Sequence, residues 1–272
     1  MTVQLSYTEL GPSKPQAKKL GKSMGQPIVI LHGLFGSKRN WGAIAKALSS
    51  HHRVFSLDLR NHGESEWADT MTYEALAADV AKFIHQHDLA PCTVLGHSMG
   101  GKTAMILALR QPKMISRLVV VDIAPVPRET DIGAYIQVMK DVPLVDCKTR
   151  KDVEEHLTHA IVTPTIRQFL LQNLTRDGES FRWRLNLKAL EAGMPDIANF
   201  PPVSFDVHYP GPTHFIIGGK SDYVLSHHMD TIRMLFPQTT TTTIAEAGHW
   251  VHAEAPDEFL ATLNEFLEKT EI

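Results

Sequence analysis

The stretch Gly96-His97-Ser98-Met99-Gly100 decides how this chain of 272 residues folds. The apolar run Thr93–Leu95 precedes it and a helix-like segment, 102–109, follows it, so the pattern predicts a strand, a sharp turn and a helix. Glycine on both sides of the serine lets neighbouring backbone approach closely while the serine takes a strained conformation. We therefore expect the Ser98 hydroxyl to project from the sheet toward the amide hydrogens that open the helix.

The sequence around this turn alternates between apolar runs and helical patterns. Runs at Ile28–Leu31, Val54–Leu57 and Leu118–Val121 are typical of strands buried on both faces of a parallel sheet. Helical patterns lie between the runs, at about 40–49, 72–88 and 100–111. Two later strand candidates lie at 214–217 and 240–244. An amphipathic helix follows them, from Pro256 to about Lys269. This alternation predicts an α/β fold with a mostly parallel, doubly wound sheet in three layers.

Residues 125–208 interrupt the alternation. Prolines open and close this segment, and helical stretches are expected inside it at about 129–141, 149–162 and 164–174. Because it is too long for a simple crossover, we predict a helical cap inserted in a core formed by residues 1–124 and 209–272. The alternative interpretation is that these helices are additional helices of the core.

The composition excludes several classes of function. A formal net charge of −3 provides no basic face for nucleic acid, and no apolar stretch is long enough to span a membrane. Two cysteines, Cys92 and Cys147, favour a reducing compartment over a disulfide framework, and residues 1–10 do not resemble a signal peptide. The histidine pairs at 51–52 and 227–228 lack companion ligands at zinc spacing. We therefore expect a cytoplasmic protein that uses no metal and no cofactor.

Three of the predicted strands end near residues that suit nucleophilic catalysis. Functional residues gather at the carboxyl ends of the strands in an open parallel sheet. Ser98 follows one strand, Asp122 ends the next, and His249 follows the last. A serine hydroxyl needs a base to remove its proton, so we predict His249 as that base and a carboxylate that orients it. His252 is the nearest competitor for this role, whereas His97 should point away from Ser98 and pack.

The carboxylate that orients His249 has two candidates in the sequence. Asp222 follows the penultimate predicted strand, and Asp122 follows the strand directly after the serine turn. Either position can bring a carboxylate to the histidine. The residues alone leave this choice open.

Acyl transfer also needs hydrogen-bond donors for a developing oxyanion. The backbone amide of Met99 is one donor by the geometry of the serine turn. We predict the amide of Leu34 as the second, because the glycines of the loop His32–Gly36 let it fold close to an ester carbonyl; a simple β-turn is the alternative.

In the stretch Asp58–Ser65 we predict a structural turn in which Asp58 or Arg60 hydrogen-bonds the backbone.

Six motifs in order along the chain resemble the α/β-hydrolase superfamily. They are His32–Ser37, Asp58–Gly63, Gly96–Lys102, Val121–Pro125, Phe181–Leu187 and Gly248–His252. More narrowly, they resemble the α/β-hydrolase domain-containing protein 11 family, which includes bacterial short-chain esterases and yeast alcohol acetyltransferases. The chain order Ser, Asp, His agrees with that of α/β-hydrolases, most of which place the acid where Asp222 stands. The narrower family carries this acid in a V-D-I-A-P-like motif, so the resemblance implies that Asp122 is the acid that orients His249.

Together these residues predict a serine carboxylesterase that cleaves small-molecule esters with small-to-medium acyl groups through an acyl-enzyme. In this hypothesis Ser98 attacks, His249 moves the proton, Asp122 orients the histidine, and the amides of Met99 and Leu34 bind the oxyanion. Because any admitted nucleophile can open an acyl-enzyme, an alcohol acyltransferase or a thioesterase on the same triad is the alternative. A non-catalytic ligand-binding or partner-stabilising protein is the remaining hypothesis, which the complete Ser-Asp-His set disfavours.

Overall fold

A seven-stranded sheet forms the centre of the computed structural model, which describes residues 1–12, 25–128, 131–204 and 206–270. Its strands are β1 (Tyr7–Leu10), β2 (Ile28–Leu31), β3 (Val54–Leu57), β4 (Cys92–His97), β5 (Ile115–Val121), β8 (Thr213–Gly218) and β9 (Thr239–Ile244). They lie in the order β1-β3-β2-β4-β5-β8-β9, with β1 antiparallel to β3 and the other neighbours parallel. The predicted α/β fold with its mostly parallel, doubly wound sheet is confirmed.

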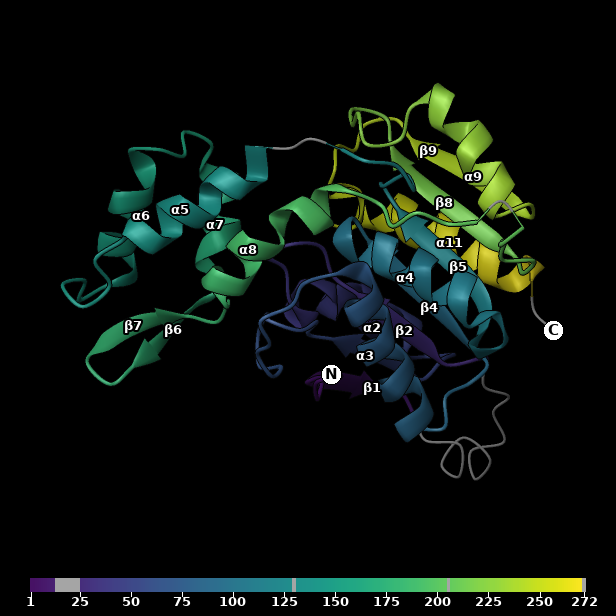
Figure 1. The fold of residues 1–272 in the computed structure, drawn as a ribbon, viewed down its shortest axis with the longest axis horizontal. Coiled ribbons are helices and arrows are strands. Elements are labelled where there is room, and N and C mark those ends of the chain that lie inside the picture. The colour runs from purple at the N-terminus through teal and green to yellow at the C-terminus, as the bar shows by residue number, and fades with distance from the viewer. Residues whose placement is uncertain (13–24, 129–130, 205, 271–272) are drawn as a thin grey trace.

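Alternate residues of the central strands β2, β3, β4, β5 and β8 contribute to two separate hydrophobic cores. Ile28 and Ile30 of β2 belong to the core that α2 (Gly42–Leu48) and α11 (Pro256–Lys269) cover. Val29 and Leu31 belong to the opposite core, under α3 (Tyr73–Gln86) and α4 (Met99–Arg110). This two-residue period explains why the strand reads as a continuous apolar run, since both faces of the sheet are covered by helices (Figure 1). Burying each such side chain contributes about 1.5–3 kcal/mol.

Two further helices complete the part of the core that follows β8. They are α9 (Met229–Leu235) and the short α10 (Val251–Glu254), which lies directly before α11. Within the described ranges, every helix is too short or too polar to cross a lipid bilayer.

A long insertion joins β5 to β8. It contains α5 (Ala134–Asp141), α6 (Arg150–Thr158), α7 (Pro164–Leu171), the hairpin strands β6 (Leu174–Asp177) and β7 (Ser180–Trp183), and α8 (Leu187–Ala198). Figure 1 shows these elements gathered to one side of the sheet. The first expected helix began at 129, and residues 129 and 130 lie outside the described residues.

The helix expected over 164–174 is present but ends three residues early, and a hairpin that was not predicted follows it. Helix α7 ends at Leu171, and β6 pairs with β7 from Leu174 opposite Trp183 to Asp177 opposite Ser180. Gly178 in the two-residue loop has φ +61°, a left-handed conformation that glycine adopts without steric cost. Glycine at the first position of a two-residue loop, here Gly178, is the turn signal that the sequence contains.

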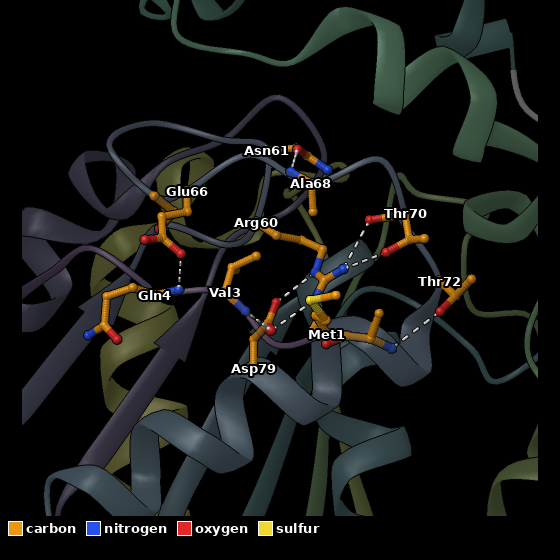
Figure 2. Close-up of polar contacts among 12 residues, drawn as sticks. Met1, Val3, Gln4, Arg60, Asn61, Glu66, Ala68, Thr70, Thr72 and Asp79 are labelled. Carbon is orange, nitrogen blue, oxygen red and sulfur yellow. Dashed lines mark hydrogen bonds and ion pairs between the residues drawn. The ribbon is translucent and has the colours of Figure 1, made fainter.

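A buried ion pair ties the loop after β3 to helix α3. Arg60 Nε and Nη2 donate to the two carboxylate oxygens of Asp79 at 2.6 and 2.8 Å, and both side chains are fully buried. Figure 2 shows Arg60 lying between Asp79 and Thr70, whose hydroxyl and carbonyl oxygens it also contacts. Asp79 accepts a further hydrogen bond from the backbone nitrogen of Val3. The pair therefore holds three distant segments together.

We expect Asp79→Ala to destabilise the fold by about 3–5 kcal/mol, because removing one partner of a buried pair leaves the other charge uncompensated. The measurement is the free energy of unfolding in urea. The control is Glu74→Ala on the same helix, which removes an exposed pair with Arg110 and should cost at most about 1 kcal/mol. Equal losses for the two variants would contradict this role of the Arg60–Asp79 pair.

Candidate active site

Ser98 is the single residue between the end of β4 at His97 and the start of α4 at Met99. Its backbone has φ +52° and ψ −118°, a conformation that costs a non-glycine residue about 1–3 kcal/mol. A Cβ atom at Gly96 would lie 2.1 Å from the carbonyl oxygen of Gly100, and one at Gly100 would lie 2.4 Å from that of Leu31. Both glycines are thus required by close backbone approach, and the turn presents Ser98 at the carboxyl end of the sheet.

His249 and Asp122 form a hydrogen-bonded pair near this turn. Nδ1 of His249 lies 2.7 Å from Oδ2 of Asp122, which follows β5 directly and is fully buried. The backbone nitrogen of Gly218 donates to the other oxygen at 3.0 Å, and the Ser221 hydroxyl donates to Oδ2 at 2.5 Å. Asp122 itself has φ +49°. Its carboxylate is thus fixed by three partners from the end of β8 and the loops after β8 and β9.

Asp222, the other candidate acid in the sequence, lies in a different environment. Its side chain is 72% exposed and accepts a hydrogen bond from Arg128 Nη2 at 2.7 Å. This hydrogen bond lowers the pKa of Asp222 below its usual value. The structure therefore brings Asp122 to the His249 ring, whereas Asp222 forms a surface ion pair.

Two aromatic residues hold His249 in place. The Tyr223 ring stacks on the His249 ring at 3.7 Å with an interplanar angle of 16°. His97 Nε2 lies 2.8 Å from the backbone carbonyl oxygen of His249 and donates to it. Burial, aided by the neighbouring histidines, holds the pKa of His97 well below its usual value, so this ring is neutral. Tyr223 and Ser221 were not singled out from the sequence, because only the folded loop brings them to His249 and Asp122.

His252, the competing histidine, is buried beside this pair. Its ring stacks on Trp41 at 3.9 Å, and its Nδ1 has no hydrogen-bond partner in the described part of the chain. Burial lowers the pKa of His252 to about 3. The ring that bonds to Asp122 is that of His249, and the His252 ring packs against Trp41 instead.

The loop His32–Gly36 folds against Ser98. A Cβ atom at Gly33 would lie 3.2 Å from Cβ of Ser98, and the amide of Gly36 donates to the Gly33 carbonyl at 2.9 Å. The loop is therefore a turn, as the alternative interpretation has it, and it also borders the serine. Phe35 in this loop has φ +60°.

Two buried histidines anchor this loop to the segment after β3. His32 Nε2 accepts from the amide of Leu59 at 2.9 Å, and His62 Nε2 accepts from the amide of Phe35 at 3.3 Å. Burial lowers the pKa of both rings, that of His62 to about 3, so both are neutral and can accept. These contacts fix the path of the loop beside Ser98.

Asp58 connects the same two segments. It accepts from the backbone nitrogens of Lys38 at 2.7 Å and Glu64 at 2.9 Å, as expected for a residue with a structural role. It also pairs with the buried Lys38 ammonium at 2.9 Å. Lys38 was not predicted from the sequence, since a lysine outside any motif carries no signal of burial.

A cavity of 280 Å³ opens onto these residues. Ser98, Leu34 and His249 line it, and most of its remaining wall is apolar. The insertion contributes Ile132, Tyr135, Ile166, Phe169 and Leu170. A smaller cavity of 40 Å³ adjoins the same serine and is lined by Leu34 and Met99. The described residues contain no group of three or more His, Cys, Asp or Glu side chains able to hold a metal ion.

Comparisons with known proteins agree with this architecture. The model of the alpha/beta hydrolase family matches residues 28–262. The sn-1-specific diacylglycerol lipase ABHD11 of Mus musculus is 44% identical over 248 residues, covering 88% of this chain and 80% of the relative. Esterase YbfF of Escherichia coli (strain K12) is 37% identical over 245 residues, which cover 89% of this chain and 92% of the relative. Among solved structures, a marine microorganism esterase is 34% identical and superposes with a TM-score of 0.90, over 97% of this chain and 100% of that one. The chain therefore belongs to the alpha/beta hydrolase family.

Proposed function

We propose that this chain hydrolyses carboxylic esters through an acyl-enzyme on Ser98, with His249 as the general base and Asp122 as the orienting acid. The observation that carries the proposal is the 2.7 Å contact between His249 Nδ1 and Asp122 Oδ2, beside a cavity that Ser98 and His249 both line. With Nδ1 engaged, Nε2 is the ring nitrogen available for the serine proton. The names of the mouse and Escherichia coli relatives, a lipase and an esterase, support the same class of reaction.

The reaction proceeds in two acyl-transfer steps. Ser98 Oγ attacks the ester carbonyl carbon while His249 takes the hydroxyl proton, and the collapsing intermediate releases the alcohol with that proton. Water then attacks the acyl-serine while His249 takes a proton from it. As this second intermediate collapses, the bond between the acyl carbon and Ser98 Oγ breaks, His249 returns its proton to Ser98 Oγ, and the carboxylic acid leaves. The buried Asp122 carboxylate stabilises the imidazolium in both steps, and its hydrogen bonds from Ser221 and Gly218 hold it in position.

The oxyanion formed in each step would bind the amides of Leu34 and Met99. Met99 occupies the first position of α4, where a backbone N–H has no acceptor within the helix. Leu34 lies in the loop that borders Ser98, and both residues line the small cavity beside the serine. Such preorganised donors stabilise charge that develops only in the transition state.

In this proposal residues 125–208 act as the cap over the site. The insertion supplies apolar side chains to the 280 Å³ cavity, with Phe169 facing Trp250 at 5.7 Å between ring centroids. An apolar cavity of this size suits the hydrocarbon part of a small-to-medium ester.

Acyl transfer to an alcohol is the second candidate, because an alcohol would compete with water for the acyl-serine. The apolar wall of the cavity favours this reaction, since it can contact the hydrocarbon part of an alcohol. The test supplies an activated acetyl ester together with ethanol and measures acetate and ethyl acetate. We expect acetate to be the main product, because water is in large excess over the alcohol. Ethyl acetate as the main product would instead establish a transferase, and no turnover of the ester would contradict both activities.

A further inference from the structure

A second, smaller cavity adjoins Ser98, and its lining, unlike that of the first, includes two cationic residues. It measures 40 Å³ and shares Ser98, Leu34 and Tyr223 with the large cavity. Lys102 and Arg128 line it, and no aspartate or glutamate is among its described lining residues. Because a water molecule needs about 10–15 Å³ of such space, the small cavity has room for a polar group the size of a carboxylate. Ser98 thus lies between a large apolar cavity and a small one whose mostly apolar wall includes two cationic residues.

Lys102 is a buried cation without a carboxylate partner in the described residues. It lies on α4, one turn after Ser98, and is 2% exposed. Its ammonium donates to the carbonyl oxygens of Ala198 at 3.2 Å and Asn199 at 2.9 Å, at the carboxyl end of α8. These carbonyls carry only the partial negative charge of a helix end, which compensates a buried ammonium incompletely. Burial and the like charge of Arg128 lower the pKa of Lys102 to about 8.

Arg128 approaches the same point from the start of the insertion. Its backbone nitrogen donates at 2.8 Å to the Ala198 carbonyl that also accepts from Lys102. Its guanidinium lies 3.8 Å from the centre of the Tyr223 ring and pairs with Asp222. Its Nε is buried and has no hydrogen-bond partner in the described part of the chain. Two cations therefore converge on the small cavity, and one of them retains an unused donor.

We propose that the small cavity is a binding subsite for a carboxylate on the acyl group of the substrate. The preferred substrate is then a half-ester of a short dicarboxylic acid, with its apolar alcohol part in the large cavity. This specificity rests on the proposed ester hydrolysis at Ser98. An anion between Lys102 and Arg128 would relieve their mutual repulsion and accept charge-assisted hydrogen bonds from both.

The position of the oxyanion donors places the ester carbonyl beside the small cavity. Leu34 and Met99 both line the small cavity, whereas Met99 is not among the residues of the large one. The acyl carbonyl oxygen must reach these amides during the reaction. In the proposed binding mode the acyl group extends toward Lys102 and Arg128, and the alcohol group lies among aromatic residues such as Phe169 and Trp250.

The test compares two esters that differ only in the end of the acyl group. Monohexyl succinate carries a carboxylate where hexyl butanoate carries a methyl group, and released hexanol is measured for both at pH 7. We expect kcat/KM for the half-ester to exceed that for the neutral ester by about tenfold or more, the effect of one charge-assisted hydrogen bond. This ratio should fall by about tenfold in Arg128→Met and in Lys102→Met.

The control is Arg110→Met, which removes an exposed positive charge from the far end of the same helix α4. In Arg110→Met the ratio of kcat/KM for the half-ester to that for the neutral ester should equal the ratio in the unmodified protein. Because the ratio uses the neutral ester as an internal reference, a general loss of activity or stability in Lys102→Met does not imitate the expected result. Cleavage of hexyl butanoate without a preference for the half-ester overturns the subsite alone, as does a ratio unchanged by Arg128→Met. Failure to cleave either ester overturns the ester hydrolysis itself.

Discussion

Ser98→Ala is expected to abolish ester hydrolysis, with kcat falling by about 10⁴- to 10⁶-fold. The physical reason is that alanine provides no oxygen to form the acyl-enzyme, so only the oxyanion donors and substrate binding remain to assist water. The measurement is the release of p-nitrophenol from short p-nitrophenyl esters by pure protein. A fluorophosphonate, which modifies activated serines, should label the unmodified protein once and the variant not at all.

The strained turn at Ser98 calls for a second variant. Alanine retains the Cβ atom that makes φ +52° unfavourable, whereas glycine adopts positive φ without strain. Ser98→Gly should therefore be equally inactive while at least as stable as the unmodified protein, which separates loss of chemistry from loss of fold. Ser50→Ala, at an exposed position after α2, should retain full activity. Hydrolysis or labelling that persists in both Ser98 variants would contradict the proposed nucleophile.

Asp122→Asn is expected to lower kcat by about 10⁴-fold, whereas Asp222→Asn should change it by less than about threefold. An amide at position 122 cannot stabilise the imidazolium of His249 and turns the ring toward the wrong tautomer. Asp222 lies in an exposed ion pair with Arg128, so its charge contributes little at His249. The measurement is kcat for a neutral ester in the two variants.

Asparagine is a suitable replacement for Asp122. Asp122 has φ +49°, and asparagine tolerates positive φ better than most residues. Its one oxygen can keep the hydrogen bond from Gly218 to Oδ1, while its amide NH₂ takes the place of Oδ2, to which Ser221 and His249 bond. The fold of Asp122→Asn should therefore persist, which thermal unfolding can verify. If Asp222→Asn proved the more damaging change, the acid of the proposed mechanism would have to be reassigned.

The sequence predicted the centre of the sheet well because the central strands are buried on both faces. The apolar runs at 28–31 and 54–57 coincide with β2 and β3, and the final helix begins at Pro256 as expected. These elements follow from local hydrophobic periodicity, which needs no knowledge of distant contacts. The hairpin β6–β7 was missed because its strands are short and half exposed, so they show no buried run.

The environment of the candidate site was less predictable than its residues. Tyr223, Ser221 and Lys38 belong to no chemical motif, and each acquires its role only through contact with a residue far away in the chain. Lys102 lies inside the motif Gly96–Lys102, yet its burial and its approach to Arg128 depend on the end of α8. Burial and the convergence of charges are properties of packing, which a single sequence does not display.

By itself the sequence determined the α/β fold and the strand–turn–helix that presents Ser98, because glycine spacing and apolar periodicity act over a few residues. Only the tertiary structure placed a carboxylate on His249. The parallel order of β5, β8 and β9 brings Asp122 to within 2.7 Å of a histidine 127 residues away, while Asp222 turns outward to Arg128. Such a contact depends on the arrangement of neighbouring strands, and local sequence does not specify which loop ends will meet.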